Sequence, residues 1–401
     1  MITALRGMKD ILPPQNRKFT YFLENCSAIV RKYGFEFIET PILEETALFR
    51  RSVGESSDIV GKEMYQFTDK GGNDVCLRPE GTAGVVRAFI EKKYDRQGGI
   101  HRFFYHGPMF RYERPQKGRF RQFHQFGVES FGVADAMEDA NIILMLKEIL
   151  DFFGISYTLK LNSLGCPECM PPYREKLQHF LGTVSDALCE DCQRRKETNP
   201  IRVFDCKNSR CQEILTPAPR LDAHLCDACD SHFGKLRELL DSQGVAYELD
   251  PNLVRGLDYY NKTAFEFISG DLGAQNAVAG GGRYDRLVSF LDGKETPAIG
   301  FAIGIERLME MIELPETARE GYYFGALCEE ARIPLFAAAA RERAHAKVTM
   351  GYDVRSLKAH LKAADKAGAR YCAVIGEDEL AAGKIWVKDL EAKQETLRPL
   401  E

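Results

Sequence analysis

The chain has 401 residues, 44% of them hydrophobic and 28% charged, with a formal net charge of −5. This composition is typical of a globular protein, and the length calls for a large domain with one or two smaller units. The negative net charge excludes a general attraction to nucleic acid, so a polyanion would have to bind at local basic patches. The chain has no run of about 18 apolar residues, and its start, MITALRGMKD, lacks the apolar core of a signal peptide, so we expect a cytoplasmic protein without membrane contact.

The first segments predict a helix followed by a strand at an edge. Apolar residues recur at helical spacing from Phe19 to Tyr33, and Gly34 ends the run. The strand-like stretch FEFIETPILEE, residues 35–45, contains Pro41, which cannot donate a hydrogen bond to a sheet. We therefore expect an edge or interface strand there, with a core helix as the alternative.

Residues 49–69 are polar and loop-like, and the stretch after them contains a candidate cation-binding side chain. DVCLRPEGTAGVVRAFIE, residues 74–91, predicts a strand, a turn and a helix. A proline and a glycine flank Glu80 and keep it extended just before the helix, for which Thr82 is the expected N-cap. Glu80 is therefore placed to meet a cation, unless its charge serves only the helix dipole.

Residues 104–132, FYHGPMFRYERPQKGRFRQFHQFGVESFG, predict an antiparallel hairpin of two aromatic-rich strands joined by the loop ERPQKGR. Because side chains alternate across a strand, one face is polar and the other is suited to a core. The polar face holds Arg111, Glu113, Arg121, Phe123, Gln125, Gly127 and Glu129, and the apolar face holds Phe104, Phe110, Phe120 and Phe126. Guanidinium groups, an exposed ring and acceptors together suit a nucleotide, while a half-buried hairpin with a solvated charged face is the alternative.

A helix over 136–153 and a strand at 158–165, TLKLNSLG, lead into a cysteine-rich segment. In a large chain without an export signal, the twelve cysteines are expected as thiols or metal thiolates. Eight of them form three CxxC pairs and one CxxxxC pair, namely Cys166, Cys169, Cys189, Cys192, Cys206, Cys211, Cys226 and Cys229. Eight thiolates would fill two tetrahedral zinc sites, while a core that buries the cysteines as small hydrophobic thiols is the alternative.

The stretch LVRGLDYYN, residues 253–261, is expected to be extended and to continue into the strand FEFISG. Arg255 beside a glycine brings a fixed cation close to the backbone, and Tyr259 and Tyr260 supply rings with hydroxyl tips. AGGGRYDRLV, which begins at Ala279, predicts a glycine-rich turn followed by a helix, a turn being a commoner explanation than a phosphate site.

The stretch TPAIGFAIGIERLMEMI, residues 296–312, predicts a buried strand that passes into a helix. Arg307 lies in the first turns of this helix, where the helix dipole disfavours a cation, so an anionic partner is expected. From Gly321 onward strands alternate with helices, which indicates a small α/β domain. Its second helix carries a basic stripe, of a kind that is usually only solvated, at Arg355, Lys358, Lys362 and Lys366.

Three of these runs carry a resemblance to a known family. FRYERPQKGRFRQFHQFGVESFG resembles the second signature motif of class II aminoacyl-tRNA synthetases in the form used by histidyl-tRNA synthetases, and LVRGLDYYN and AGGGRYD resemble that family's two histidine-specific motifs. The resemblance extends from about Arg6 to about Leu390. It implies an α+β fold in which an antiparallel sheet is flanked by helices, with a helical cysteine-rich insertion and a C-terminal α/β anticodon-binding domain.

The resemblance also implies a division of the chain. The catalytic domain would comprise residues 1–165 and 244–318, and the insertion at 166–243 would touch the acceptor arm of tRNA. Residues 319–401 would form the anticodon-binding domain, whose basic stripe would face the anticodon stem-loop. The helix and strand around Pro41 would be the first class II motif and form the interface of a homodimer.

The implied reaction has two steps. Histidine and ATP, the latter with Mg²⁺, would form histidyl-adenylate, and the histidyl group would pass to the 3′ end of tRNA(His). One alternative is a non-catalytic, histidine-sensing regulatory subunit of ATP phosphoribosyltransferase, which predicts eroded ATP motifs and no C-terminal domain. Another is a tRNA sensor domain, which usually belongs to a far longer chain.

Position by position, the resemblance implies a role for each candidate residue. Arg255 and Arg111 would be the catalytic cations at the α-phosphate, and ATP would bind to Arg111, Glu113, Phe123 and Arg307. Histidine would bind to Glu80, Thr82, Gln125, Glu129, Arg255, Tyr259, Tyr260 and Tyr284. The first base pair of tRNA would face Arg114 and Gln116.

Overall fold

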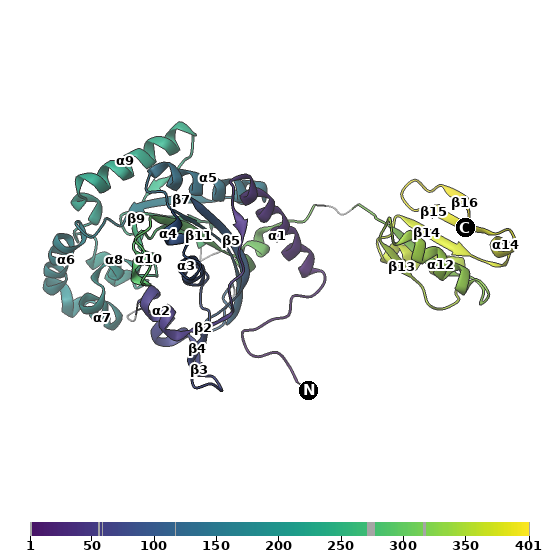
Figure 1. Cartoon of the computed structure of the whole chain (residues 1–401), viewed down its shortest axis with the longest axis horizontal. Coiled ribbons are helices and arrows are strands. Elements are labelled where there is room, and N and C mark those ends of the chain that lie inside the picture. The colour runs from purple at the N-terminus through teal and green to yellow at the C-terminus, as the bar shows by residue number, and fades with distance from the viewer. Residues whose placement is uncertain are drawn as a thin grey trace. The chain divides into compact units, whose positions relative to one another are not determined.

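The computed structural model describes residues 2–54, 57, 59–116, 118–270, 277–315 and 318–400. The chain forms two compact units, a large unit at Met1–Glu313 and a small unit at Leu314–Glu401, which are described separately (Figure 1). Among the described residues, no helix combines the length and the apolar character needed to cross a membrane.

An eight-stranded sheet forms the centre of the large unit in its described part. Its strands pair antiparallel, except that the edge strands at both ends pair parallel with their neighbours. In spatial order they are β1 Glu36–Phe37, β5 His101–Phe110, β6 Gln122–Phe131, β11 Ala298–Gly304, β10 Ala277–Arg283, β9 Asn261–Ile268, β7 Thr158–Ser163 and β8 Glu248–Leu249. The predicted hairpin is therefore confirmed as β5 and β6. The single strand expected over residues 35–45 is instead two short strands, β1 and β2 Leu43–Glu45, with Pro41 between them, and each lies at the edge of a different sheet.

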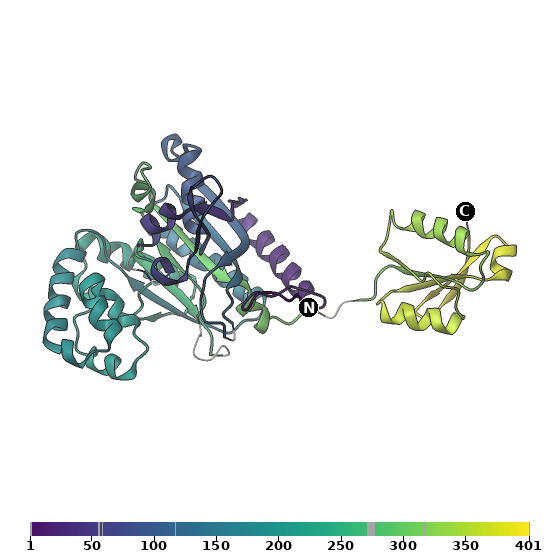
Figure 2. The same cartoon turned by 90° about the horizontal axis from the view of Figure 1, so that it is seen from below.

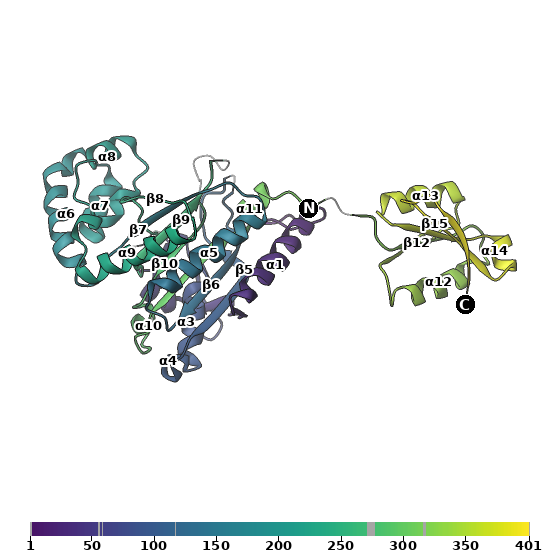
Figure 3. The same ribbon diagram turned by 90° about the horizontal axis from the view of Figure 1, so that it is seen from above.

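Helices cover one face of this sheet and enclose the main core (Figure 3). They are α1 Gln15–Lys32, α5 Ala136–Phe152, α9 Asp227–Ser242 and α11 Ile305–Met311. Asp135 caps α5 by accepting a hydrogen bond from the backbone N–H of Met137 at 2.8 Å, and two acidic residues in the first turn suit the helix dipole. Alternate side chains of β6, such as Phe126 and Val128, enter this core, so their neighbours face the opposite side of the sheet.

The segment expected to be a loop, residues 49–69, is largely structured, and that prediction is wrong. It contains the end of α2 Thr46–Val53, a π-helix at Ile59–Glu63 and β3 Tyr65–Thr68. Phe49, Val53 and Ile59 are buried in a local cluster with Cys76 and Ala83, and this burial outweighs the polar average of the segment. Neighbouring elements are β2 Leu43–Glu45, β4 Asp74–Leu77, α3 Thr82–Glu91, α4 Tyr94–Gln97 and α10 Leu287–Phe290.

Three smaller expectations also fail. The glycine run that begins at Gly280 is not a turn but the middle of β10, deep in the sheet. Residues 253–260 form bends and turns rather than an extended strand. Phe120 is not part of the core but borders the cavity described below, since its position lies before β6 begins, where the alternation of faces no longer holds.

The cysteine-rich insertion is helical, as expected, and its helices gather at one end of the large unit (Figure 2). Its elements are α6 Met170–Val184, a 3₁₀ turn at Ser185–Ala187, α7 Glu190–Thr198, a 3₁₀ helix at Pro200–Asp205, α8 Ser209–Ile214, a 3₁₀ turn at Leu221–His224 and α9. A small core separate from the main one holds these elements together, and several of its members are cysteines. The far end of α9 instead packs into the main core through Phe233, Leu236 and Leu240.

The small unit is the predicted α/β domain. Its sheet has the order β13 Val348–Met350, β12 Tyr322–Ala326, β14 Tyr371–Ile375, β15 Lys384–Asp389 and β16 Glu395–Pro399. Helix α12, Arg332–Glu342, packs on the face of Phe324, and α13, Leu357–Lys366, packs on the face of Tyr323. The short helix α14, Glu377–Ala381, and β16 were not predicted.

A buried ion-pair network joins the helical layer to the sheet. Arg283, at the end of β10, donates from Nε to Asp139 Oδ1 at 2.7 Å and from Nη1 to Asp285 Oδ1 at 2.9 Å. The Arg283 and Asp139 side chains are both fully buried. Burial works against ionisation of Asp285, but Arg283 and Lys262 outweigh it and lower the pKa of Asp285.

Replacing Arg283 by Met should strongly destabilise the large unit, because Asp139 would be left as a buried charge without its main cation. Removal of one partner of such a pair costs about 3 to 5 kcal/mol in the free energy of unfolding. Urea denaturation measures this loss. In the control Lys32→Met, which removes an exposed ion pair to Glu148, the midpoint should barely move. Equal small shifts in both variants would contradict the structural role of Arg283.

Candidate active site

A cavity of about 280 Å³ opens on the sheet face opposite the helices. The hairpin β5–β6, the strands β10 and β11, and the loop 253–260 contribute its walls. The cavity brings together these predicted residues: Glu80, Thr82, Arg111, Glu113, Phe123, Gln125, Glu129, Arg255, Tyr259, Tyr260 and Arg307. Side chains that lie far apart in the sequence thus share one concave surface, which is the usual form of a ligand site.

Arginines crowd one part of this cavity. The guanidinium of Arg111 lies 5.3 Å from the ring centroid of Phe123, and its Nε donates to the carbonyl of Pro79 at 2.9 Å. Arg307 Nη1 donates to the carbonyl of Ala277 at 3.0 Å. Burial, together with the nearby charges of Arg119 and Arg111, lowers the pKa of Arg307. This region is therefore electropositive and suits a polyanion such as a phosphate chain.

The sequence reasoning missed Arg119, which lines the same cavity and pairs with Glu113 at 2.9 Å. It lies in the hairpin loop, where Gln116 and Arg119 form an isolated antiparallel bridge. The predicted tRNA-facing residues Arg114 and Gln116 lie in this loop too, but both are exposed and neither lines the cavity. The loop thus has one side toward the cavity and one toward solvent.

Arg255 reaches the cavity from the loop 253–260. Its Nη1 donates to Glu266 Oε1 at 2.8 Å, and its guanidinium lies 5.7 Å from the ring centroid of Tyr260. Gly280 in β10 lies against this guanidinium: a Cβ there would sit 2.5 Å from Arg255 Nη1. Glu266 lies opposite Gly280 in the β9–β10 register, so the glycine gives the ion pair its space on the sheet.

Carboxylates and phenols occupy the other part of the cavity. Glu80 accepts hydrogen bonds from the backbone N–H groups of Thr82 at 2.6 Å and Ala83 at 3.0 Å. The expected N-cap role of Thr82 is therefore wrong, since Glu80 satisfies these donors at the start of α3. Thr82 Oγ1 donates instead to Glu129 Oε1 at 2.7 Å, and Tyr284, which lies behind the cavity wall, donates to Glu129 Oε2.

Glu129 is the most enclosed acid of this site, with 1% of its surface exposed. Burial raises the pKa of Glu129 to about 8, even though hydrogen bonds from Tyr284 and Thr82 act in the opposite direction. Gly300 of β11 stands directly opposite in the register, and a Cβ there would lie 2.0 Å from Glu129 Oε2. The site can thus hold a buried carboxyl that ionises when a cation arrives.

Four buried polar atoms of cavity-lining residues have no hydrogen-bond partner among the described residues, namely Gln125 Oε1, the Tyr259 hydroxyl oxygen, Arg255 Nε and Glu113 Oε2. Of these, Glu113 Oε2 still forms an ion pair with Arg119. A buried polar atom without a partner costs free energy, so such atoms at a cavity wall mark where a polar ligand completes the bonding. Together with Glu80 and Glu129, the Gln125 and Tyr259 oxygens fit a small ligand that carries several N–H donors.

The eight insertion cysteines form two clusters, and each cluster could hold a metal ion. The first comprises Cys166, Cys169, Cys226 and Cys229, and the second comprises Cys189, Cys192, Cys206 and Cys211. Within each cluster the sulfurs lie within 4.8 Å of one another, for example 3.7 Å from Cys166 to Cys226 and 3.8 Å from Cys189 to Cys206. All eight are free thiols. Tetrahedral zinc–sulfur bonds of about 2.3 Å would place sulfurs about 3.8 Å apart, which matches these distances.

Comparison with known proteins identifies relatives over the whole chain. A family model described as histidyl-tRNA synthetase matches residues 7–169 and 208–308, and a model described as anticodon binding domain matches residues 337–401. The stretch 170–207 lies between the two ranges of the first match.

Individual relatives agree with these matches. The histidine–tRNA ligase of Sulfurimonas denitrificans is 63% identical over 98% of each chain, and that of Campylobacter fetus is 57% identical over 98% of this chain and 97% of the other. The crystal structure of apo S. aureus histidyl-tRNA synthetase superposes with a TM-score of 0.84 at 35% identity, covering 100% of this chain and 98% of the other.

The raised pKa of Glu129 predicts a pH dependence of stability. A carboxyl whose pKa is about 8 in the folded state and 4.5 in the usual case favours folding below pH 4.5 and loses this contribution as the pH rises through 8. The loss amounts to roughly 1.4 kcal/mol per pH unit between these values. Urea unfolding from pH 5 to 8.5 should show a stability difference between wild type and Glu129→Gln that falls as the pH rises. Parallel curves would contradict it.

Proposed function

The chain belongs to the histidyl-tRNA synthetase family, and from this premise we propose how its cavity carries out the family's reaction. The enzyme is a class II aminoacyl-tRNA synthetase that activates histidine with ATP and transfers the histidyl group to tRNA(His). The observation that carries the proposal for the site is the shared cavity, in which Arg111, Arg255 and Arg307 lie beside Glu80 and Glu129. Cations for a triphosphate thus stand next to carboxyls for an amino acid.

ATP occupies the arginine-rich part of the cavity. Phe123 stacks on adenine and Glu113 accepts a hydrogen bond from the adenine amino group. Arg307 holds the γ-phosphate end, while Arg111 meets the α-phosphate. The lowered pKa of Arg307, caused by burial and by the charges of Arg119 and Arg111, supports this assignment, because a polyanion relieves this unfavourable environment.

Arg255 acts on the α-phosphate from the side opposite Arg111. Histidine's carboxylate attacks this phosphorus and pyrophosphate leaves, so negative charge develops on the phosphoryl oxygens. A fixed guanidinium stabilises that charge, and the Glu266 carboxylate keeps it in place. Positioning and charge stabilisation account for the rate, because the carboxylate is already a good nucleophile and pyrophosphate is already a good leaving group.

Mg²⁺ bound with ATP would supply charge neutralisation on the triphosphate, and it would need one or two carboxylates of the chain. The donor set of the cavity fits this requirement, since the Glu266 carboxylate borders the same cavity as the arginines and would hold the ion.

Histidine occupies the carboxyl-rich part. Glu80 and Thr82 bind its α-amino group, and Gln125, Glu129 and the three tyrosines enclose its side chain, namely Tyr259, Tyr260 and Tyr284. The unpaired Gln125 Oε1 and Tyr259 hydroxyl support this assignment, because an imidazole N–H supplies what they lack. A site built to pair such groups rejects analogues without them.

We assign tRNA contacts to three regions. The exposed loop residues Arg114 and Gln116 face the first base pair, and the insertion at 166–243 meets the acceptor arm. The domain at 319–401 binds the anticodon stem-loop. The exposed basic side chains of α13 support the last assignment, namely Lys358, Lys362 and Lys366.

A cytoplasmic homodimer completes the proposal. Phe37, Ile42 and Leu43 flank Pro41 and are each more than 40% exposed, which is a suitable surface for a partner chain. All twelve cysteines are free, as in a reducing compartment. The regulatory-subunit alternative is not favoured, since the ATP-binding side chains share one cavity and a C-terminal anticodon-domain match is present.

Zinc is the metal that we assign to both cysteine clusters. Four thiolates at tetrahedral separations are the usual donor set for structural zinc. The small insertion core contains cysteines where other domains have larger apolar side chains, so bound metal would supply stability that this core lacks.

Arg255→Ala should reduce histidine-dependent ATP–pyrophosphate exchange by about 100-fold or more, while ATP still binds in equilibrium dialysis. The rate should fall because no other side chain of the loop 253–260 can supply a fixed positive charge at the α-phosphate. The exposed helix residue Arg237 gives a matched control, and Arg237→Ala should leave the exchange rate unchanged. Full exchange in Arg255→Ala would remove its catalytic role.

Elemental analysis of protein purified without chelators should find about two zinc ions per chain, one for each tetrathiolate cluster. Cys166→Ser with Cys226→Ser should lower this to about one, and so should Cys189→Ser with Cys206→Ser, because each pair removes ligands from a single cluster. A content below about half an equivalent would show that the clusters are thiol cores instead.

A further inference from the structure

The second cysteine cluster surrounds a segment that touches the catalytic loop. Cys189 immediately precedes α7, Cys192 lies in its first turn, and Cys206 follows the 3₁₀ helix Pro200–Asp205. A metal bound by this cluster would therefore fix both ends of the segment 190–205. Apart from the metal ligand Cys192 and the general assignment of the insertion to the acceptor arm, no role has been given to residues of this segment.

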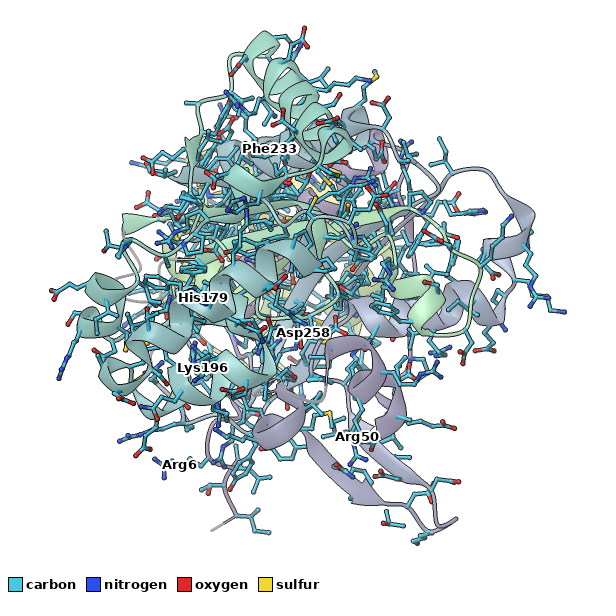
Figure 4. All side chains as sticks on the ribbon, turned by 90° about the vertical axis from the view of Figure 1, so that its left-hand side faces the viewer. Arg6, Arg50, His179, Lys196, Phe233 and Asp258 are labelled. Atoms are coloured by element: carbon cyan, nitrogen blue, oxygen red, sulfur yellow. The ribbon has the colours of Figure 1, made fainter. Side chains whose placement is uncertain are left out.

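Two side chains of this segment reach the loop that carries Arg255. Asn199 Nδ2 donates to Asp258 Oδ1 at 2.9 Å. Arg202 pairs with the same carboxylate, at 3.2 Å from Nε to Oδ1, and donates from Nη2 to the carbonyl of Gly256. The contacts thus fall on Gly256 and Asp258, which lie shortly after Arg255 in the same loop. Figure 4 shows Asp258 between the insertion, marked by Lys196, and α2, marked by Arg50.

Asp258 is also fixed from the side of α2. A Cβ on Gly54 would lie 2.4 Å from Asp258 Oδ2, and the backbone N–H of Asp258 faces the carbonyl of Val53. The Arg202 and Asp258 side chains are 12% and 25% exposed, so solvent screens their attraction less than that of a surface pair. The carboxylate is therefore held between two elements, of which only one belongs to the insertion.

The loop forms no strand, so no sheet ladder holds it. Its apolar anchors are Leu253 and Tyr259, which are buried near its two ends, whereas Asp258 is fixed by polar contacts. A second cavity of about 290 Å³ lies between it and the insertion, and Arg255, Tyr259 and Tyr260 border both this cavity and the active-site cavity. With a cavity on each side of the loop, the polar contacts of Asp258 and Gly256 add to these apolar anchors in setting its position.

We propose that Arg202 and Asn199 are positioning residues: through Asp258 and Gly256 they clamp the loop 253–260, so that Arg255 points at the reacting phosphate. Metal at the second cluster holds this clamp in place. The inference rests on the proposed role of Arg255 and, for its metal part, on the proposed zinc. Both clamp residues lie in the stretch 170–207, between the ranges that the family model matches. The clamp would therefore be a feature of this chain's insertion rather than of the family's motifs.

Arg202→Met keeps the length of the side chain and removes its charge and donors. We expect kcat for histidine-dependent ATP–pyrophosphate exchange to fall about tenfold or more, because small misplacements of a catalytic group are costly. KM for ATP should stay within about twofold, since Arg111, Phe123 and Arg307 lie outside the loop, whereas KM for histidine should rise, because Tyr259 and Tyr260 lie in it. Arg237→Met, on an exposed face of the same insertion, should leave both parameters unchanged.

Further variants separate positioning from general stability. Arg202→Lys should recover part of kcat, because an ammonium reaches Asp258 but not the Gly256 carbonyl as well. Asp258→Asn should lower kcat, and the double variant with Arg202→Met should lose little more than either single one. A wild-type kcat in Arg202→Met, or fully additive losses, would overturn the clamp.

The metal part has its own readout. Cys206→Ser with Cys211→Ser should remove about one zinc and lower kcat as Arg202→Met does, and adding Arg202→Met should cause no further loss. If the wild-type protein contains no zinc, the metal assignment is wrong, whereas a kcat loss in Arg202→Met still supports the clamp. If the protein contains zinc and the cysteine variant keeps full kcat, the metal assignment stands and the link to the loop is wrong.

Discussion

The active site depends on how closely charged side chains can lie against the central sheet. Glu129 and Glu266 each stand opposite a glycine in the strand register, Gly300 and Gly280 respectively. A Cβ on Gly300 would collide with Glu129, and a Cβ on Gly280 would collide with the Arg255 guanidinium that pairs with Glu266. Without these glycines the carboxyl and guanidinium groups would be pushed away from the sheet, and the cavity between them would close.

This constraint also explains why the cavity has two electrostatic parts. On one part, burial and the charges of Arg119 and Arg111 lower the pKa of Arg307, and on the other part burial raises the pKa of Glu129 to about 8. Each part is unfavourable when empty, and each becomes favourable when a ligand of opposite charge arrives. A ligand pair with a polyanionic and a cationic end, such as ATP and an amino acid, satisfies both parts at once.

Sequence patterns predicted the elements whose causes are local. The period-two alternation of the hairpin gave the correct strands and brought Phe123, Gln125 and Glu129 to one face. Glycines at 280–282 suggested a turn by local preference, but they lie in β10 because tertiary neighbours leave no room for side chains. The place of Arg119 in the cavity and the grouping of the cysteines into two clusters could not be predicted either. Both depend on tertiary structure, namely on where the chain returns after a loop or a helix.

The cysteine pairing is nested: the outer pairs of the segment form one cluster and the inner pairs form the other. The outer cluster joins the point where the chain leaves the sheet, after β7, to the start of α9, which packs back on the main core. The inner cluster encloses the segment that reaches Asp258. A small core rich in cysteine buries little apolar surface and is correspondingly weakly stabilised by packing. Metal ligation is therefore the physical means by which such an insertion could hold a loop of the active site.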